Sequence, residues 1–349
     1  MPNGEREWIR SRVEGLIDGA EEVEPVYQED IDNSFDTWSA LKLIVHSATI
    51  NMYTKVIANH ADHFFYIDAL AGSGLSEYGE EECFYGSPIV AAKHAAEPFT
   101  KMYFFEGEEE KCEILEQRLE YVFNNESNEI SEPGEWVVWH GDANDLIHDA
   151  TSDIWSYWDS GEMFNTLTFA DNQAMDFMWD SMIEVGDLTG DLLINYQGAM
   201  AIGMNINNEA AHEGQMKEFF GRNLWEENLS SREEYKQEYM RQMESLFDDT
   251  CHQVPVKVRS GTKSFEYDMI YSTRDTERGS GYVEAIEYVK EFVENVDGAD
   301  VEDMLELMHG NQSAMDNYLP QDREIDDDLL DGDSTGSRSE NQSGLDSFY

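Results

Sequence analysis

The segment from Phe64 to Pro88, FFYIDALAGSGLSEYGEEECFYGSP, decides which fold this chain can adopt. Its first seven residues are apolar or aromatic except for Asp68, which predicts a buried strand with one carboxylate near its end. Gly72 and Gly74 follow directly, and glycine lets the backbone approach a ligand where a side chain would block it. A strand that runs into such a turn is typical of nucleotide-like cofactor sites. We therefore look for function around Asp68.

Apolar runs and helical patterns alternate along the rest of the chain. Further strands are predicted at Met102–Phe105, Trp136–Trp139, Thr166–Phe169 and Leu192–Tyr196. Helices are predicted at 37–60, 88–96, 109–124, 143–148 and 175–185. Before the second of these helices, Ser87 supplies a capping hydroxyl and Pro88 suits the first helical position. The alternation predicts parallel strands with right-handed crossovers, hence an α/β fold with a Rossmann-like doubly wound sheet.

The remaining segments set the expected domain boundaries. We expect an acidic N-terminal leader with a short helix at 1–35, the main domain at 36–300, and a C-terminal helix with an acidic, disordered tail at 301–349. A helical insertion is expected at 206–250, with a capping box that begins at Ser231. It either acts as a lid over the carboxyl edge of the sheet or simply packs there. A closing hairpin at 257–272 and a helix at 283–293 complete the domain.

The composition is strongly acidic around an ordinary apolar core. The 349 residues include 75 Asp and Glu against 22 Lys and Arg, which gives a formal charge of −53, yet 40% of the residues are apolar and 12% are aromatic. An acidic surface suits a cytosol of molar salt, where the Debye length shrinks to about 3 Å and like charges repel little. The sequence therefore indicates a halophilic source.

Several classes of protein and site fit the sequence poorly. No apolar run approaches the roughly 20 residues that span a bilayer, and MPNGEREWIRSRVEG lacks the apolar core of a signal peptide. The three cysteines, Cys83, Cys112 and Cys251, are far apart, which argues against a disulfide framework or a zinc site. His60, Asp62 and His63 stand together without a partner cluster, so no metal is expected. We expect a cytoplasmic protein.

Nucleic-acid binding is only weakly supported, because contacts with phosphate normally leave a basic footprint. The one local concentration of positive charge is Lys257, Arg259 and Lys263, with Arg274 and Arg278 further along the chain. Exposed strand edges explain most such clusters. A role of this cluster in binding a substrate remains the alternative.

Ligands of open α/β sheets bind beyond the carboxyl ends of the strands, where the strand order reverses. Those ends carry Asp68, Glu106, Asp142 and Asp171. Glu106 is placed to accept hydrogen bonds from ribose hydroxyls, Asp142 to accept one from an adenine amine, and Asp171 to approach a substrate. In a chain this acidic, some strands end in a carboxylate by chance, so only the set together with the glycine turn indicates a site.

S-adenosylmethionine fits these residues better than a nicotinamide cofactor does. The nicotinamide fingerprint needs GxGxxG running directly into a helix, whereas Gly74 is followed by Leu75, Ser76 and Glu77, and the next predicted helix begins near Pro88. No GKS or GKT follows the glycines, which disfavours a phosphate loop. The cationic amino group of S-adenosylmethionine suits Asp68, with the backbone at Ala71, Gly72 and Gly74 holding its methionine part.

The chain resembles the three-Cys-motif partner family (TcmP), whose members look like class I, Rossmann-type methyltransferases. The similarity runs from about Trp38 to Gly281 and is most specific at three places: Trp38 with Lys42, YIDALAGSG at 66–74, and GSPIVA at 86–91. FFEGEE at 104–109, HGDAND at 140–145 and LLINYQGAMAIGMN at 192–205, which contains Asn195, match more loosely. The resemblance implies a methyltransferase-like fold and association with a radical-type protein that carries the three-cysteine motif.

One departure from the family bears on catalysis. Where the family tends to read DP-x-G after the fourth strand, this chain reads Asp171-Asn172-Gln173-Ala174. The leading hypothesis is an S-adenosylmethionine-dependent methyltransferase of unknown substrate, with Asp171 or Asn195 facing that substrate. The alternative is a non-catalytic partner or specificity module of a three-Cys-motif protein, acting in nucleic-acid modification or defence.

Overall fold

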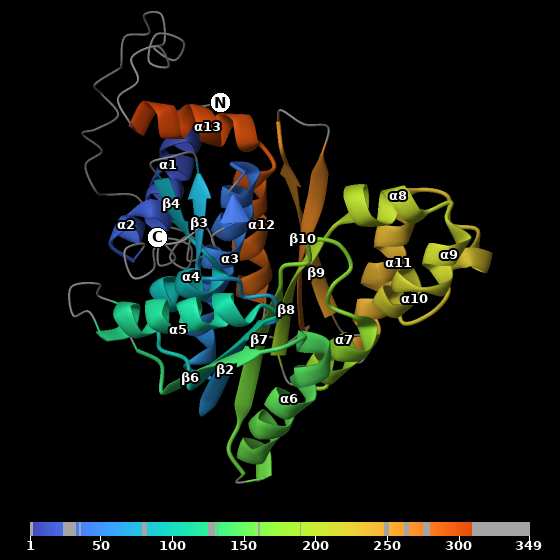
Figure 1. The fold of residues 1–349 in the computed structure, drawn as a ribbon, viewed down its shortest axis with the longest axis horizontal. Helices are drawn as coiled ribbons and strands as arrows, with labels where there is room; N and C mark the ends of the chain where they lie inside the picture. The colour runs from blue at the N-terminus through green and yellow to red at the C-terminus, as the bar shows by residue number, and fades with distance from the viewer. Residues whose placement is uncertain are drawn as a thin grey trace, which may run out of the picture.

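A seven-stranded sheet forms the centre of the molecule (Figure 1). The computed structural model describes residues 3–308, apart from 24–32, 35, 79–81, 125–129, 131, 160, 189, 248–250, 262–264 and 275–279. The strands are β2 (His63–Asp68), β5 (Lys101–Glu106), β6 (Glu135–His140), β7 (Phe164–Ala170), β8 (Gly190–Tyr196), β9 (Cys251–Arg259) and β10 (Glu266–Arg274). The first strand and the four that follow it are confirmed, as is the closing hairpin.

The strand order across the sheet is β6-β5-β2-β7-β8-β10-β9. From β6 to β8 all pairs are parallel, and β10 runs antiparallel to both of its neighbours. The chain moves from β2 to one side and then returns to add strands on the other side, so the order reverses beside β2. This is the predicted Rossmann-like doubly wound sheet.

Helix α3 (Trp38–Ile57) precedes the first strand of the sheet, as predicted. The helices that connect the parallel strands are also at the predicted places: α4 (Ser87–His94), α5 (Glu109–Asn124), α6 (Ala143–Asp159) and α7 (Trp179–Gly186). Helix α6 continues well beyond the predicted end at His148 because Ile147, Ala150 and Ile154 keep a buried stripe at helical spacing. The capping prediction was wrong in detail. Gly86 is the N-cap of α4 and Ser87 is already helical.

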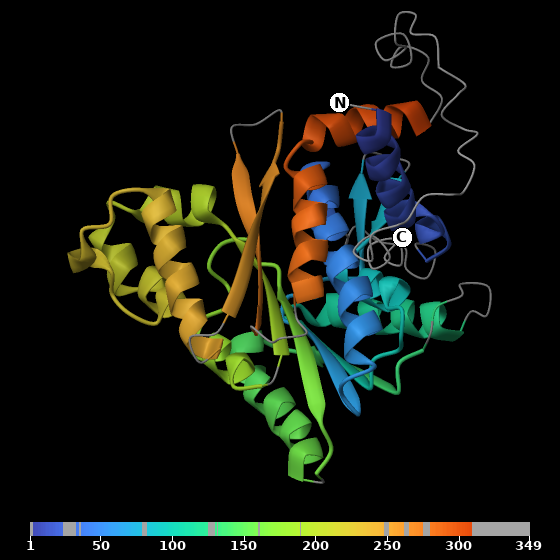
Figure 2. The same cartoon turned by 180° about the vertical axis from the view of Figure 1, so that it is seen from behind.

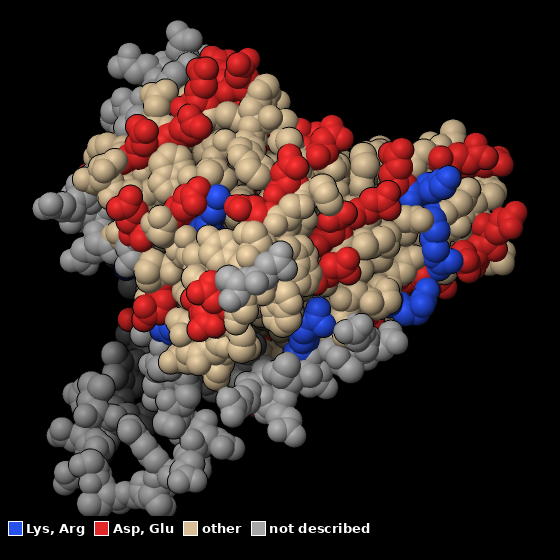
Figure 3. All heavy atoms as spheres, turned by 90° about the horizontal axis from the view of Figure 1, so that it is seen from below, with Lys and Arg blue, Asp and Glu red and all other residues tan. Residues whose placement is uncertain are grey.

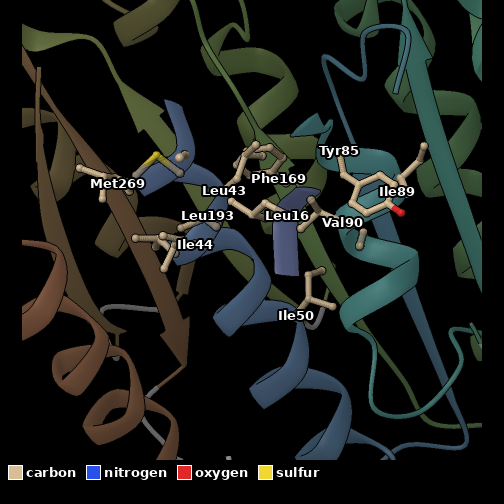
Figure 4. Close-up of a cluster of buried hydrophobic side chains, with 14 of the residues drawn as sticks. Leu16, Leu43, Ile44, Ile50, Tyr85, Ile89, Val90, Phe169, Leu193 and Met269 are labelled. Carbon is tan, nitrogen blue, oxygen red and sulfur yellow. The ribbon is translucent and has the colours of Figure 1, made fainter. Parts of the chain in front are cut away.

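Alternate residues of each strand face opposite sides of the sheet and define two cores. Phe64 and Tyr66 of β2 join the core under α3, α4, α5 and α12 (Ser280–Val293), whereas Phe65 and Ile67 join the core under α6 and α7. Figure 2 shows α3 and α12 side by side in front of the sheet. In Figure 4 the first core brings Leu43 and Ile44 of α3 together with Phe169 of β7.

The N-terminal segment contributes to the same core. Helix α1 (Asn3–Ile17) buries Ile9, Val13 and Leu16 completely, and α2 (Ala20–Val23) follows it. Within the described part of the leader, Glu7 of α1 and Glu21 and Glu22 of α2 are exposed, whereas the apolar side chains face the core. At the other end of the chain, α13 (Gly298–Met308) follows α12, and the tail expected to be disordered lies outside the described residues.

A second, three-stranded sheet lies directly after the glycine turn. Its strands are β1 (Asn33–Ser34), β3 (Leu75–Tyr78) and β4 (Glu82–Tyr85), in the order β1-β3-β4. Strands β3 and β4 form an antiparallel hairpin that the sequence analysis did not assign. The hairpin separates the glycine turn from α4.

The insertion forms a helical lobe beyond β8 and β10 (Figure 1). It contains α8 (Gly203–Asn205), α9 (Glu209–Glu213), α10 (Gln215–Phe220) and α11 (Arg232–Glu244), together with the short helices η3 (Gly198–Ile202), η4 (Trp225–Glu227) and η5 (Ser245–Phe247). The predicted capping box of Ser231 and Glu234 is confirmed at the start of α11.

Candidate functional site

The glycine turn at the carboxyl end of β2 has a backbone that only glycine adopts without strain. The φ angles of Gly72 and Gly74 are +66° and +89°. A Cβ atom added to Gly72 would meet nothing within 4 Å, so this side of the turn faces open space. A Cβ atom added to Gly74 would approach the Leu115 side chain at 3.0 Å. Gly72 therefore faces a ligand space, whereas Gly74 faces the core.

Four hydrogen bonds from neighbouring elements fix this turn. The Ala71 N–H donates to the Phe105 carbonyl at 2.8 Å, and the Gly72 N–H donates to Glu106 Oε2 at 2.9 Å. The Gly86 N–H donates to the Gly74 carbonyl at 2.7 Å. From α5, Arg118 Nη1 donates to the Ser73 carbonyl at 3.0 Å. The turn is thus held in one conformation before any ligand arrives.

A cavity of about 910 Å³ opens above the turn at the carboxyl edge of the sheet. It extends from Lys42 of α3 to Gln215 and Glu218 of α10 in the lobe. The predicted site residues that line it are Ala71, Gly72, Gly74, Glu106, Asp142 and Asp171. The fold therefore brings six of the eight predicted residues to one cavity, and Asp68 and Asn195 are not among its lining.

Glu106 and Asp142 stand at the ends of neighbouring strands. The second Glu106 oxygen, Oε1, accepts from the Glu108 N–H at 2.8 Å, so this carboxylate bridges two backbone segments and is still partly exposed. Asp142 is exposed at the start of α6, where Oδ1 accepts from the Asn144 N–H at 2.9 Å. Each carboxylate keeps lone pairs for a ligand, although Asp142 also has a capping role.

Asp68 lies behind the turn instead of facing the cavity. Its side chain is completely buried and accepts from the Tyr66 hydroxyl at 3.1 Å and from the Leu70 N–H at 3.3 Å. Burial raises its pKa to about 7, while hydrogen bonds from Ser87, Leu70 and Tyr66 oppose the shift. Asp68 is not among the residues that line the cavity, and its binding of the cationic amine stays a prediction. Desolvation favours its neutral form, and its hydrogen-bond partners position the turn.

A buried histidine completes the network behind the turn. The Tyr66 hydroxyl also contacts His46 Nε2 at 3.0 Å, and the His46 ring stacks on Phe169 with the ring centroids 4.2 Å apart. Burial lowers the pKa of His46 to about 3. The imidazole is therefore neutral at physiological pH. His46 could not be singled out from the sequence, because a lone histidine on an apolar helix does not by itself indicate a functional site.

Asp171 forms a chain of polar contacts at the floor of the cavity. Its Oδ2 atom pairs with Lys42 of α3, and its Oδ1 atom accepts from Asn195 Nδ2 at 2.8 Å. Asn195 is buried, and its Oδ1 atom accepts from Gln197 Nε2 at 3.2 Å. Asn195 therefore acts on the cavity through Asp171. The sequence indicated Lys42 only as part of a motif. In the structure Lys42 lines the cavity, although its neighbours in the chain, Leu41 and Leu43, are core residues.

Side chains shape the loop after β7, where the resembled family tends to have proline and glycine. Asp176 Oδ2 accepts from the Gln173 and Ala174 N–H groups at 2.8 and 2.9 Å. Asn172 accepts from the Phe177 N–H at 2.8 Å, and Asn144 of α6 accepts from the Met178 N–H at 2.9 Å. These bonds give the loop a defined shape without the DP-x-G sequence.

The basic cluster makes contacts within the protein. Lys257 Nζ lies 3.2 Å from Glu266 Oε1, Arg259 donates to the Glu294 carbonyl, and Arg274 donates to the Leu188 carbonyl at 3.4 Å. The other two members, at 263 and 278, lie outside the described residues. These contacts favour the strand-edge interpretation of the cluster over the substrate-binding one.

The structure also bears on the predictions for a metal site and for a membrane-spanning helix. The Asp62 carboxylate accepts from the Met163 N–H at 2.9 Å, and His63 Nε2 lies 3.2 Å from Glu162 Oε2. Within the described ranges, no three His, Cys, Asp or Glu side chains come together as a metal site. Nor does any helix in that part of the chain have the length and apolar character needed to cross a bilayer.

Solved structures with a similar arrangement include one complex with S-adenosyl-L-methionine and one with SAH. Protein LPL1258 from Legionella pneumophila aligns with a TM-score of 0.40 and 10% identity, over 71% of this chain and 92% of that one. Trm1 from Pyrococcus horikoshii, in complex with S-adenosyl-L-methionine, gives 0.35 and 12%, over 69% and 58%. An O-methyltransferase from Bacillus cereus, in complex with SAH, gives 0.32 and 12%, over 74% and 99%. No family model and no curated protein sequence matches the chain.

Proposed function

We propose that this protein binds S-adenosylmethionine in the cavity at the carboxyl edge and is a class I methyltransferase-like protein. The observation that carries the proposal is one cavity lined by the glycine turn, Glu106 and Asp142, at the point where the strand order reverses. Numbered from β2 along the chain, the strands of the large sheet run 3-2-1-4-5-7-6, with strand 7 antiparallel. This is the doubly wound order 3-2-1-4-5 with an antiparallel hairpin added at one edge.

The residues fit this cofactor in three respects. The open side of Gly72 leaves backbone at Ala71 to Gly74 accessible to the methionine part. Glu106 holds the ribose hydroxyls and Asp142 the adenine amine. A cavity of about 910 Å³ is of the size that encloses a ligand of this kind. When bound, the cofactor supplies an activated methyl group on a sulfonium.

A dinucleotide fits less well. Dinucleotide sites place the pyrophosphate on the N-terminus of a helix that follows the glycine turn directly. Here the turn runs into strand β3, and α4 begins only at Ser87.

The test is a binding titration in molar KCl with S-adenosylmethionine, its demethylated product and NAD⁺. We expect the first two ligands to bind and NAD⁺ to give no signal. Glu106→Gln should weaken binding about tenfold or more, because a hydrogen bond to a charged group contributes about 1.5–3 kcal/mol. Glu113→Gln is the matched control, since Glu113 is exposed on the next helix, α5, and does not line the cavity. Equal weakening in the two variants, or no binding at all, would contradict the proposal.

A second candidate function is the non-catalytic one: a partner or specificity module of a three-Cys-motif radical-type protein. It is favoured by the pairing of Asp171 with Lys42 and Asn195, which occupies both carboxylate oxygens. The matched pair of variants is Asp171→Asn and Lys42→Met. If both variants keep the activity of the protein in cells, and S-adenosylmethionine still binds to them, the result supports the partner role. Loss of activity in both, with cofactor binding unchanged, supports catalysis.

A further inference from the structure

Strand β6 is an open edge of the large sheet. It stands at one end of the strand order, and the part of the chain that the structure describes adds no strand beyond it. The N–H groups of Glu135 and Gly141 donate to carbonyls in and next to β5, at 3.0 and 2.9 Å. Successive N–H groups of a strand point to opposite sides, so those of Trp136, Val138 and His140 point away from β5. Such an unpaired row of donors and acceptors is a template for a further strand.

The opposite edge of the sheet, β9, has features that normally prevent such pairing. Pro255 has no N–H group, and Lys257 and Arg259 place positive charge along the strand. The Lys257 N–H donates to Glu294 Oε1 at 3.0 Å, and Arg259 donates to the carbonyl of the same residue. Strand β6 reads EWVVWH and contains no proline, lysine or arginine. Of the two edges, β6 is therefore the one suited to accept another strand.

The side chains of β6 suit a buried interface. In a chain with 75 Asp and Glu among 349 residues, the strand has one carboxylate, Glu135, and Lys101 Nζ lies 2.9 Å from its Oε1 atom. The four residues that follow are apolar and only partly buried: Trp136, Val137, Val138 and Trp139. The first and third pack toward one core of the sheet, and the second and fourth pack toward the other. By contrast, β5, β7 and β8 are almost completely buried.

We propose that β6 pairs with β6 of a second copy of this chain, so that two seven-stranded sheets join into one. A two-fold axis normal to the sheet makes the two strands antiparallel and keeps each face of the joined sheet continuous. With the axis at Val138, Trp136 lies opposite His140 of the second copy. On the other face, Val137 lies opposite Trp139 of the second copy. This register uses the outward N–H groups of all three residues named above.

A second copy is favoured over a strand of another protein because β6 complements itself. In this register an aromatic residue stands opposite a β-branched one, which is a favourable cross-strand pair, and no two like charges stand opposite each other. In molar salt the carboxylates elsewhere on the two copies repel little beyond about 3 Å. The pairing does not depend on the proposed function, although β6 leads directly into Gly141 and Asp142 of the cavity lining.

Sedimentation velocity of the full chain in molar KCl, over about 1 to 100 µM, tests the pairing. We expect a species of twice the mass of one chain. Val138→Pro removes the outward N–H at the centre of both strands and should weaken the dimer about tenfold or more. Val138→Thr keeps the N–H and the β-branched shape, and it should remain dimeric. A Val138→Pro protein that dimerises as tightly as Val138→Thr contradicts the proposal.

Hydrogen exchange of the unaltered protein tests the same edge without a variant that has to fold. Exchange of the amides in 135–140 should slow as the protein concentration rises through the range in which the dimer forms, whereas exchange in 251–259 should not change. A dimer whose β6 amides exchange at the same rate at every concentration overturns the proposal. A protein that stays monomeric also overturns it, and leaves a strand of a different protein as the occupant of this edge.

Discussion

At the scale of single residues, Asp68 is a buried carboxylate at the end of β2, and its hydrogen-bond partners set its position. Its orientation depends on Tyr66 and on Ser87, which is nineteen positions away in the chain, and neither contact has a local signature. Lys42 and Asp171 likewise pair across 129 positions. Long-range partners of this kind cannot be read from one sequence.

The raised pKa of Asp68 leads to a prediction about pH. The pKa of Asp68 is about 7 in the folded protein against an ordinary value of 3.8, so from about pH 4 to pH 7 the unfolded chain has released a proton that the folded chain still holds. The stability contributed by this group is therefore complete below pH 4 and is lost as the pH rises through 7. Relative to wild type, Asp68→Asn should gain about 2 kcal/mol in the free energy of unfolding between pH 5 and pH 8.

Urea denaturation at constant high KCl measures this difference. Asn keeps an acceptor for the Leu70 N–H but cannot ionise. The difference between the two proteins therefore reports the titration of Asp68 and not the loss of this hydrogen bond. Parallel pH profiles for the two proteins would show that Asp68 does not hold a proton in the folded state.

At the scale of elements, the strands were predicted because each is an apolar run that ends in a polar residue. The hairpin of β3 and β4 was not assigned, because its strands are only four residues each and the sequence between them is Gly-Glu-Glu. The hydrogen bonds that hold the glycine turn could not be predicted from the sequence either. They come from β5, from α5 and from the residue before α4, which meet only when the sheet is assembled.

The hydrogen bond from Arg118 to the Ser73 carbonyl can be tested without changing the cavity lining. Arg118 is almost completely buried, and its loss leaves the Ser73 carbonyl without this donor, at a cost of about 1–3 kcal/mol. Arg118→Met should therefore raise the dissociation constant for S-adenosylhomocysteine about tenfold, and Arg118→Lys, which keeps a cationic donor, should recover part of that loss.

The control for this variant is Arg10→Met. Arg10 is exposed on α1, and among the described residues its salt bridge is with the nearby Glu14. Thermal unfolding is measured alongside binding. If Arg118→Met lowers the melting temperature but leaves the dissociation constant unchanged, Arg118 supports the fold and does not position the turn.

At the scale of the whole molecule, carboxylates far outnumber basic side chains. Figure 3 shows them over the face seen from below, with a line of Lys and Arg on the helical lobe. In the lobe, Arg222 lies 2.7 Å from Glu227, and Arg241 lies 2.6 Å from Glu238. Even with every Lys and Arg paired with a carboxylate, the whole net charge of −53 remains uncompensated. The prediction of a salt-dependent protein rests on this excess.

Removing salt should therefore destabilise the fold. As KCl falls from 3 M to 0.1 M, repulsion among the carboxylates is no longer screened. We expect the melting temperature, followed by circular dichroism, to fall by about 10 °C or more, which corresponds to several kcal/mol for a chain of this size. An equimolar sodium sulfate series separates charge screening from the strengthening of apolar contacts. An unchanged melting temperature in dilute buffer would contradict the halophilic interpretation.

The most direct test of the central claim is a crystal structure of the protein grown in molar KCl with S-adenosylhomocysteine. We predict ligand density in the cavity above Gly72, with the ribose hydroxyls within hydrogen-bond distance of Glu106 and the adenine beside Asp142. Density for the ligand elsewhere on the molecule, or an empty cavity at a saturating ligand concentration, would contradict the claim that this edge of the sheet is a cofactor site.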